Sequence, residues 1–128
     1  MKKGGILHPA INLLLSSTGH TDYFTICDKG YPVPDGPTRI DLAFIEGVPS
    51  VLDVLRAIDA EYQIDRVLIA NEMTEVSPAR VAELAALLCD IPIEPIPHLE
   101  LKRLSATGKA TIRTGDTVPY ANIIVVSG

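Results

Sequence analysis

Three histidines are the side chains of this sequence best suited to acid–base chemistry, because imidazole exchanges a proton close to neutral pH. His20 is the strongest candidate: it follows Gly19, which can end a helix, and it precedes a β-forming run that leads to Asp28. It could also be a packing or capping residue beside a loop. His98 is a second candidate, or simply a polar residue at a helix start. His8 precedes a proline, and we interpret it as structural.

Asp28 is the acidic candidate for binding a polar substrate. It follows the apolar run at residues 23–27, so it should lie at the carboxyl end of a strand. Ligands of open α/β sheets gather at such ends, a rule that also points to Asn71 and Glu72. A carboxylate there can accept hydrogen bonds from sugar hydroxyls. The other interpretation of Asp28 is an ordinary turn residue.

Tyr120 and Asn122 flank Ala121 where the last strand is expected to begin. Alternate residues of a strand point to the same side of the sheet. The phenol of Tyr120 and the amide of Asn122 would then lie next to each other and could hold a polyol. The alternative is a surface tyrosine and a capping asparagine. The sequence therefore supplies a histidine, a carboxylate, a phenol and an amide as a possible polar site.

Motifs for cofactor binding are absent from the sequence. The glycines form neither GxGxxG nor GxxxxGK[ST], and no HExxH, GxSxG or EF-hand loop occurs. The two cysteines, Cys27 and Cys89, do not form a CxxC pair. We therefore predict a chemistry that requires neither a metal ion nor a nucleotide cofactor.

The elements that must position these side chains alternate along the chain. Strands are predicted at residues 23–27, 39–45, 66–70, 110–114 and 122–126, and helices at residues 9–17, 49–62, 77–89 and 98–104. Residues 29–37, with three prolines and two glycines, are a loop, and the proline-rich residues 91–97 suit only an edge strand or an extended connection. This alternation predicts an α/β fold with a mixed, mostly parallel sheet flanked by helices in three layers.

Bulk properties narrow the classes of function. A chain of 128 residues with 47% apolar residues predicts one domain over residues 1–128. The net charge of −5 and the lack of a Lys/Arg cluster argue against nucleic-acid binding. No apolar stretch reaches membrane-spanning length, and no targeting segment is visible. We expect a soluble, cytoplasmic protein.

Short motifs along nearly the whole chain resemble the D-ribose pyranase family. They are residues 1–4 (MKKG), 19–22 (GHTD), 27–34 (CDKGYPVP), 39–42 (RIDL), 47–49 (GVP), 112–115 (IRTG) and 119–122 (PYAN). Each motif is short, but together, in this order, they form a specific signal. The resemblance implies a cofactor-free isomerase that interconverts the β-pyranose and β-furanose forms of D-ribose by acid–base ring opening and reclosure.

The same resemblance implies roles for particular residues. His20 takes the position of the proton donor, and the positions that bind substrate are Asp28, His98, Tyr120, Ala121 and Asn122. It also implies a ring-shaped homo-oligomer, a decamer by family pattern, with sites between subunits. A mean hydropathy of +0.25 on so short a chain independently favours a homo-oligomer.

Three alternatives remain open at this stage. The related L-fucose mutarotases share the histidine and the final Tyr/Asn pattern, although residues 19–22 and 119–122 look closer to the ribose branch. A sugar-binding accessory protein for ribose uptake would use the same residues without turnover. A nucleotide-binding regulatory domain would need a phosphate-cradling backbone, which the sequence lacks.

Overall fold

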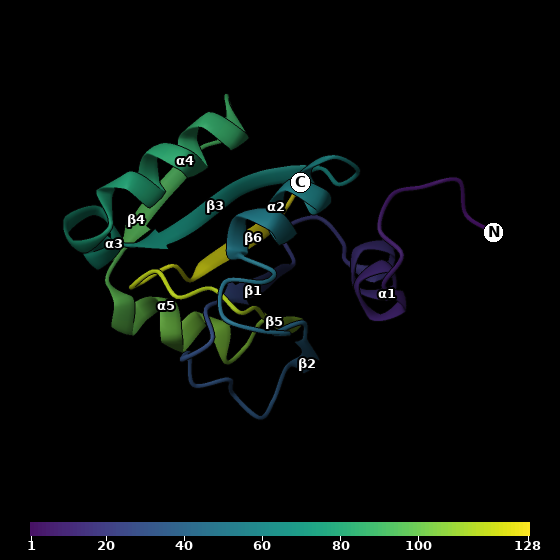
Figure 1. Cartoon of the computed structure of the whole chain (residues 1–128), viewed down its shortest axis with the longest axis horizontal. Coiled ribbons are helices and arrows are strands. Elements are labelled where there is room, and N and C mark those ends of the chain that lie inside the picture. The colour runs from purple at the N-terminus through teal and green to yellow at the C-terminus, as the bar shows by residue number, and fades with distance from the viewer.

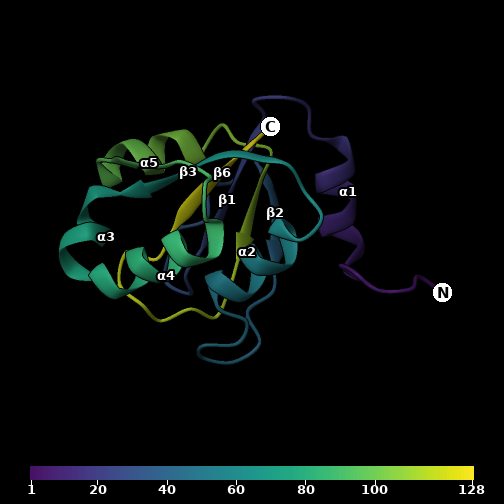
Figure 2. The ribbon, with the colours of Figure 1, turned by 90° about the horizontal axis from the view of Figure 1, so that it is seen from above.

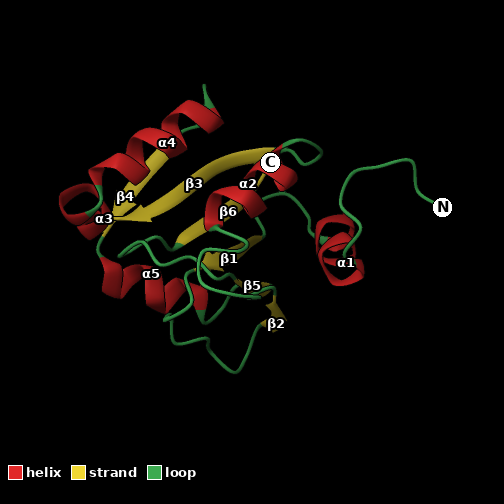
Figure 3. Cartoon of the chain, in the orientation of Figure 1, coloured by secondary structure: helices red, strands yellow, loops and turns green.

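Six strands form one mixed sheet in the computed structural model, which describes residues 1–128 (Figures 1 and 3). The strands are β1 (Tyr23–Cys27), β2 (Thr38–Asp41), β3 (Ile64–Ala70), β4 (Ile93–Ile96), β5 (Ala110–Arg113) and β6 (Ile123–Ser127). Their order is β2-β5-β1-β6-β3-β4, and only β6 runs antiparallel to its neighbours. The carboxyl ends of the other five strands and the start of β6 therefore share one edge, here called the carboxyl edge.

Five helices cover the two faces of the sheet. They are α1 (Pro9–Ser17), α2 (Val51–Asp59), α3 (Asn71–Val76), α4 (Pro78–Leu88) and α5 (His98–Ser105). α2, α3 and α4 lie over one face and α5 over the other, while α1 stands at the β2 side of the sheet (Figures 1 and 2). The predicted three-layer α/β fold is confirmed. None of these helices has the length and apolar character that crossing a membrane requires.

The strand sequences alternate between two cores, as a sheet covered on both faces requires. In β6, Ile123 and Val125 pack beneath α2 and α4, whereas Ile124 and Val126 pack toward α5. In β1, Phe24 and Ile26 belong to the larger core. Near-continuous apolar strands are thus divided residue by residue between the two helical layers.

Several helices and strands begin or end at other residues than predicted. The strand predicted at residues 39–45 ends at Asp41, because the Asp41 carboxylate accepts the Ala43 N–H at 3.1 Å and turns the chain. The helix predicted at residues 49–62 spans only Val51–Asp59, since Ser50 and Asp53 form a capping box that fixes its start. β3 begins earlier than predicted, at Ile64.

The region around Ser77 differs from prediction in two ways. Residues 71–76 form the short helix α3, which the sequence did not predict. Ser77 occupies the N-cap position of α4 as predicted, but its side chain makes no capping hydrogen bond and instead donates to the Pro119 carbonyl at 2.7 Å. The proline-rich residues 91–97 contain the edge strand β4, as the prolines indicated.

Candidate active site

Four of the predicted site residues lie at the carboxyl edge. Asp28 directly follows β1, His98 begins α5 just after β4, and Tyr120 and Asn122 immediately precede β6. β1 and β6 are adjacent strands, so Asp28 and Asn122 come together across them. The edge therefore assembles a carboxylate, an imidazole, a phenol and an amide, which were predicted from separate parts of the sequence.

Asn122 fixes the backbone at Asp28. Its buried amide oxygen accepts the Asp28 N–H at 2.8 Å, while the Asp28 Oδ1 accepts the Gly30 N–H at 2.9 Å. Burial, and to a lesser extent the charge of Asp116, raise the pKa of Asp28, although the amides of Gly30 and Tyr31 oppose this shift. The Asp28 carboxylate is thus partly desolvated and held in place by backbone amides.

His98 lies near two aromatic rings and in contact with one acidic side chain. Its ring centroid is 5.1 Å from that of Tyr120, in an edge-on arrangement, and 6.5 Å from that of Tyr31. The Glu72 carboxylate accepts the His98 backbone N–H at 3.1 Å. The His98 Nε2 is buried and has no hydrogen-bond partner. A buried nitrogen without a partner is a natural position for a ligand hydroxyl.

Burial is also the main influence on the imidazole. It lowers the pKa of His98, and the nearby Lys102 ammonium adds to this, while Glu72 and Asp28 oppose it. The lowered pKa of His98 favours the neutral imidazole, in which one ring nitrogen can donate and the other can accept a hydrogen bond.

Tyr120 and Ala121 are placed differently from the prediction. Tyr120 is not on a strand: it lies in a turn with φ of 57°, so the argument from alternating strand positions is wrong. The turn directs its ring to His98, whereas Asn122 faces Asp28. The Ala121 side chain is fully buried in the core, which leaves only its backbone groups for a ligand.

His20 lies at the opposite edge of the sheet. It precedes β1 instead of following it, and its neighbour Thr21 donates its N–H to the carbonyl of Ser127, at the end of β6. β1 alone has five residues and spans roughly 16 Å. Within a single chain His20 and Asp28 therefore do not border one pocket, because a whole strand separates them.

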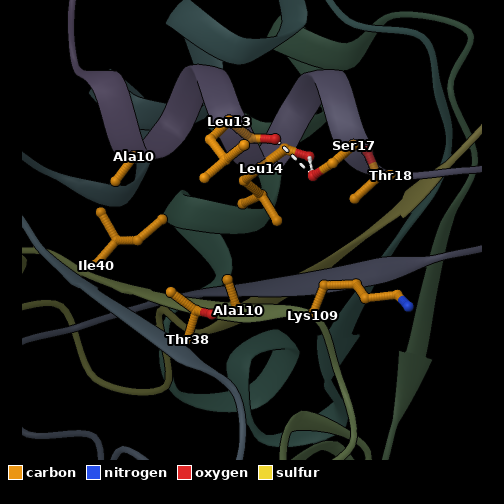
Figure 4. A pocket seen from close by; sticks show the side chains of 9 residues that line it. All are labelled: Ala10, Leu13, Leu14, Ser17, Thr18, Thr38, Ile40, Lys109 and Ala110. Carbon is orange, nitrogen blue, oxygen red and sulfur yellow. Dashed lines mark hydrogen bonds between the residues drawn. The ribbon is translucent and has the colours of Figure 1, made fainter.

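None of the hollows of the single chain is lined by the four site residues at the carboxyl edge, which are Asp28, His98, Tyr120 and Asn122. A groove of about 320 Å³ separates α1 from the β2–β5 side of the sheet, lined by Leu13, Leu14, Thr38 and Lys109 among others (Figure 4). It contains no histidine or carboxylate. An open hollow of about 590 Å³ contains His20 with Asp65, Cys89 and Asp90. No group of three or more His, Cys, Asp and Glu side chains is arranged to hold a metal ion.

A buried ion pair behind the site was not predicted from the sequence. The Arg80 Nη1 lies 2.7 Å from the Asp116 Oδ2, and both side chains are almost fully buried. The available signal was that Arg80 stands at helical spacing with Leu84 and Leu88, on the buried stripe of α4. Glu72, which the strand-end rule had indicated, does contact His98.

Comparisons with known proteins cover the whole chain. A model of the RbsD / FucU transport protein family matches residues 1–128. The D-ribose pyranase of Laribacter hongkongensis (strain HLHK9) is 43% identical over 128 residues, 100% of this chain and 98% of that protein. The structure of Bacillus subtilis RbsD complexed with D-ribose has a TM-score of 0.95 and 38% identity, covering 100% of this chain and 98% of that one.

A more distant similarity concerns the fold alone. The fucose mutarotase of Streptococcus pneumoniae, solved in complex with L-fucose, has a TM-score of 0.78 and 19% identity. It covers 95% of this chain and 93% of that chain.

Proposed function

The chain belongs to the RbsD / FucU transport protein family, and from this premise we propose that it is a D-ribose pyranase, an enzyme that interconverts the β-pyranose and β-furanose forms of D-ribose. The observation that carries the proposal is the full-length match to an RbsD structure complexed with D-ribose, at a TM-score of 0.95. The fucose mutarotase fold is more distant.

The reaction fits the side chains at the site. Ring opening delivers a proton to the ring oxygen and removes one from the anomeric hydroxyl, which breaks one C–O bond and leaves the open-chain aldehyde. Reclosure through the 4-hydroxyl instead of the 5-hydroxyl gives the furanose. No electron is transferred, and positioned acid–base groups contribute about 10²–10⁴-fold to such a step.

The carboxyl edge supplies the binding groups in this proposal. The Asp28 carboxylate accepts hydrogen bonds from sugar hydroxyls, and the orphaned Nε2 of His98 meets another hydroxyl. Asn122 has committed its amide oxygen to the Asp28 N–H, so its Nδ2 is the group left to donate. Tyr120 offers its phenol, and Ala121 its backbone.

His20 acts as the proton donor in a neighbouring copy's site. His20 and Asp28 lie at opposite edges of the sheet in one chain. They can share a site if the chains form a ring in which the His20 edge of one chain lies against the carboxyl edge of the next. Exposed apolar side chains border the carboxyl edge, as such a contact requires: Phe44 and Leu99 are each 80% exposed. We propose a ring-shaped homo-oligomer, located in the cytoplasm, where the free Cys27 and Cys89 are compatible with a reducing compartment.

Saturation-transfer NMR on D-ribose and on L-fucose tests the assignment. The protein is expected to speed pyranose–furanose exchange of D-ribose more than anomer exchange of L-fucose. Faster exchange of L-fucose would transfer the assignment to the mutarotases. Binding of D-ribose without faster exchange would identify a sugar-binding accessory protein.

Asp28→Asn is expected to weaken D-ribose binding by about 10- to 100-fold, the loss associated with one hydrogen bond to a charged group. Burial raises the pKa of Asp28, so folding favours its protonated form. Its stabilising contribution is present at low pH and lost as the pH rises through its folded-state pKa. At neutral pH the charged group thus opposes folding, and the variant should unfold at the same temperature as wild type or higher.

Calorimetric titration with D-ribose and thermal unfolding measure the two effects. Asp35→Asn, at an exposed carboxylate of the loop at residues 29–37, is the matched control and should change neither. Wild-type affinity in Asp28→Asn would make Asp28 a turn residue only.

A further inference from the structure

A buried charged pair joins α4 to the loop that leads into β6. Arg80 and Asp116 have side chains only 7% and 2% exposed, and two nitrogens of the guanidinium face the two carboxylate oxygens, at 2.7 and 3.4 Å. Neither residue touches the carboxyl-edge side chains directly. A buried pair of this kind contributes little net stability compared with apolar packing, so its presence calls for another explanation.

Asp116 connects three parts of the chain. Its carboxylate accepts the N–H of Val51, at the start of α2, at 2.8 Å, and that of Val118 at 2.9 Å. Its backbone carbonyl accepts the Lys29 N–H at 3.0 Å, one residue after Asp28. The position of Asp116 therefore sets the position of the backbone that carries Asp28.

α4 holds the same loop at a second point. Ser77, at the start of the helix, donates its hydroxyl to the Pro119 carbonyl at 2.7 Å. The next residue is Tyr120, whose backbone has φ of 57° and whose ring lies edge-on to His98. A left-handed conformation at a non-glycine residue persists only where the surroundings determine it. The first turn of α4 fixes this loop on both sides of Val118, because Arg80 binds Asp116 and Ser77 binds the Pro119 carbonyl.

We propose that Arg80 is a positioning residue of the ribose site, which holds Asp116 and thereby sets the backbone at residues 28–29 and at Tyr120. Ser77 assists Arg80 by holding the Pro119 carbonyl through a hydrogen bond. Arg80 touches no substrate in this account and acts through the residues that do. The kinetic part of the inference rests on the proposed function, whereas the placement of Tyr120 against His98 can be measured without it.

The variants Arg80→Lys and Ser77→Ala test the inference. Lysine retains the charge, so the fold survives, but it cannot reproduce the two-pronged contact of a guanidinium. Arg80→Lys is expected to raise KM for D-ribose about tenfold, as for one misaligned hydrogen bond to a charged group, with a smaller change in kcat. Ser77→Ala should change KM in the same direction by less.

Leu84→Ala is the matched control on the same helix. Leu84 is fully buried in the core, so its truncation lowers the unfolding temperature at least as much as Arg80→Lys does. It leaves the loop at residues 114–120 in place, and KM should remain at the wild-type value.

The imidazole resonances of His98 supply the second readout. The chain has three histidines, so their NMR signals are few. Arg80→Lys and Ser77→Ala should both shift the His98 signals, because the Tyr120 ring moves, and should leave those of His8 unchanged. Leu84→Ala should leave the signals of both His98 and His8 unchanged.

Unchanged His98 signals in both Arg80→Lys and Ser77→Ala would overturn the inference. An equal rise in KM for Leu84→Ala would overturn it as well, since the effect would then be one of stability. If Arg80→Lys failed to fold, Ser77→Ala would decide alone. If the wild-type protein did not speed the exchange of D-ribose, the proposed function would be wrong, but the NMR test on His98 would still apply.

Discussion

His20→Ala is expected to slow the exchange between pyranose and furanose forms of D-ribose by about 100-fold or more, while the assembled protein stays folded. The imidazole is exposed at the His20 edge and carries no core contact, so its removal should leave stability nearly unchanged. His20→Gln should bind D-ribose and remain slow, because an amide forms hydrogen bonds but does not shuttle a proton.

NMR exchange rates measure the effect, and circular dichroism checks the fold. His8→Ala is the matched control: His8 is also exposed, and its side chain makes no capping hydrogen bond to α1. It should exchange D-ribose at the wild-type rate. A folded His20→Ala protein with wild-type exchange would eliminate the proposed mechanism, and the sugar-binding accessory protein would then be the better assignment.

Mixing the two impaired variants is expected to restore part of the exchange activity. His20→Ala subunits retain Asp28, and Asp28→Asn subunits retain His20, which lies at the other edge of the sheet. If each site takes His20 from one chain and Asp28 from the next, about a quarter of the sites in a randomly mixed ring regain both groups. Unfolding and refolding the two variants together, followed by the exchange assay, measures the recovery.

The control replaces the Asp28→Asn subunits with the double variant His20→Ala/Asp28→Asn, which leaves no His20 anywhere in the ring. That mixture should exchange D-ribose no faster than the His20→Ala protein alone. Light scattering confirms that both mixtures assemble. A mixed ring with no recovery would place both residues in a site of one chain, contrary to the separation across β1.

Patterns local in the sequence predicted the fold well. The apolar run at residues 23–27 and the proline and glycine flanks of the first helix correctly located β1 and α1. Proline at positions 92, 95 and 97 correctly restricted β4 to the sheet edge. Boundaries were less accurate where a side chain decided them: Asp41 ends β2, and the capping box of Ser50 starts α2.

Arrangements that depend on topology could not be predicted in the same way. A strand separates His20 from Asp28, and the seven residues between them do not reveal that the two lie at opposite edges until the strand direction is known. Arg80 and Asp116 are 36 positions apart and meet only when α4 packs on the final loop. The left-handed turn at Tyr120 likewise depends on contacts from α4 that the local sequence does not contain.

The most direct test of the proposed function is saturation transfer between the β-pyranose and β-furanose resonances of D-ribose, with and without the wild-type protein. The acid–base account predicts that the transferred saturation rises with the concentration of added protein, since each site opens and recloses the ring. Equal transfer with and without protein, at concentrations where D-ribose is bound, would contradict it.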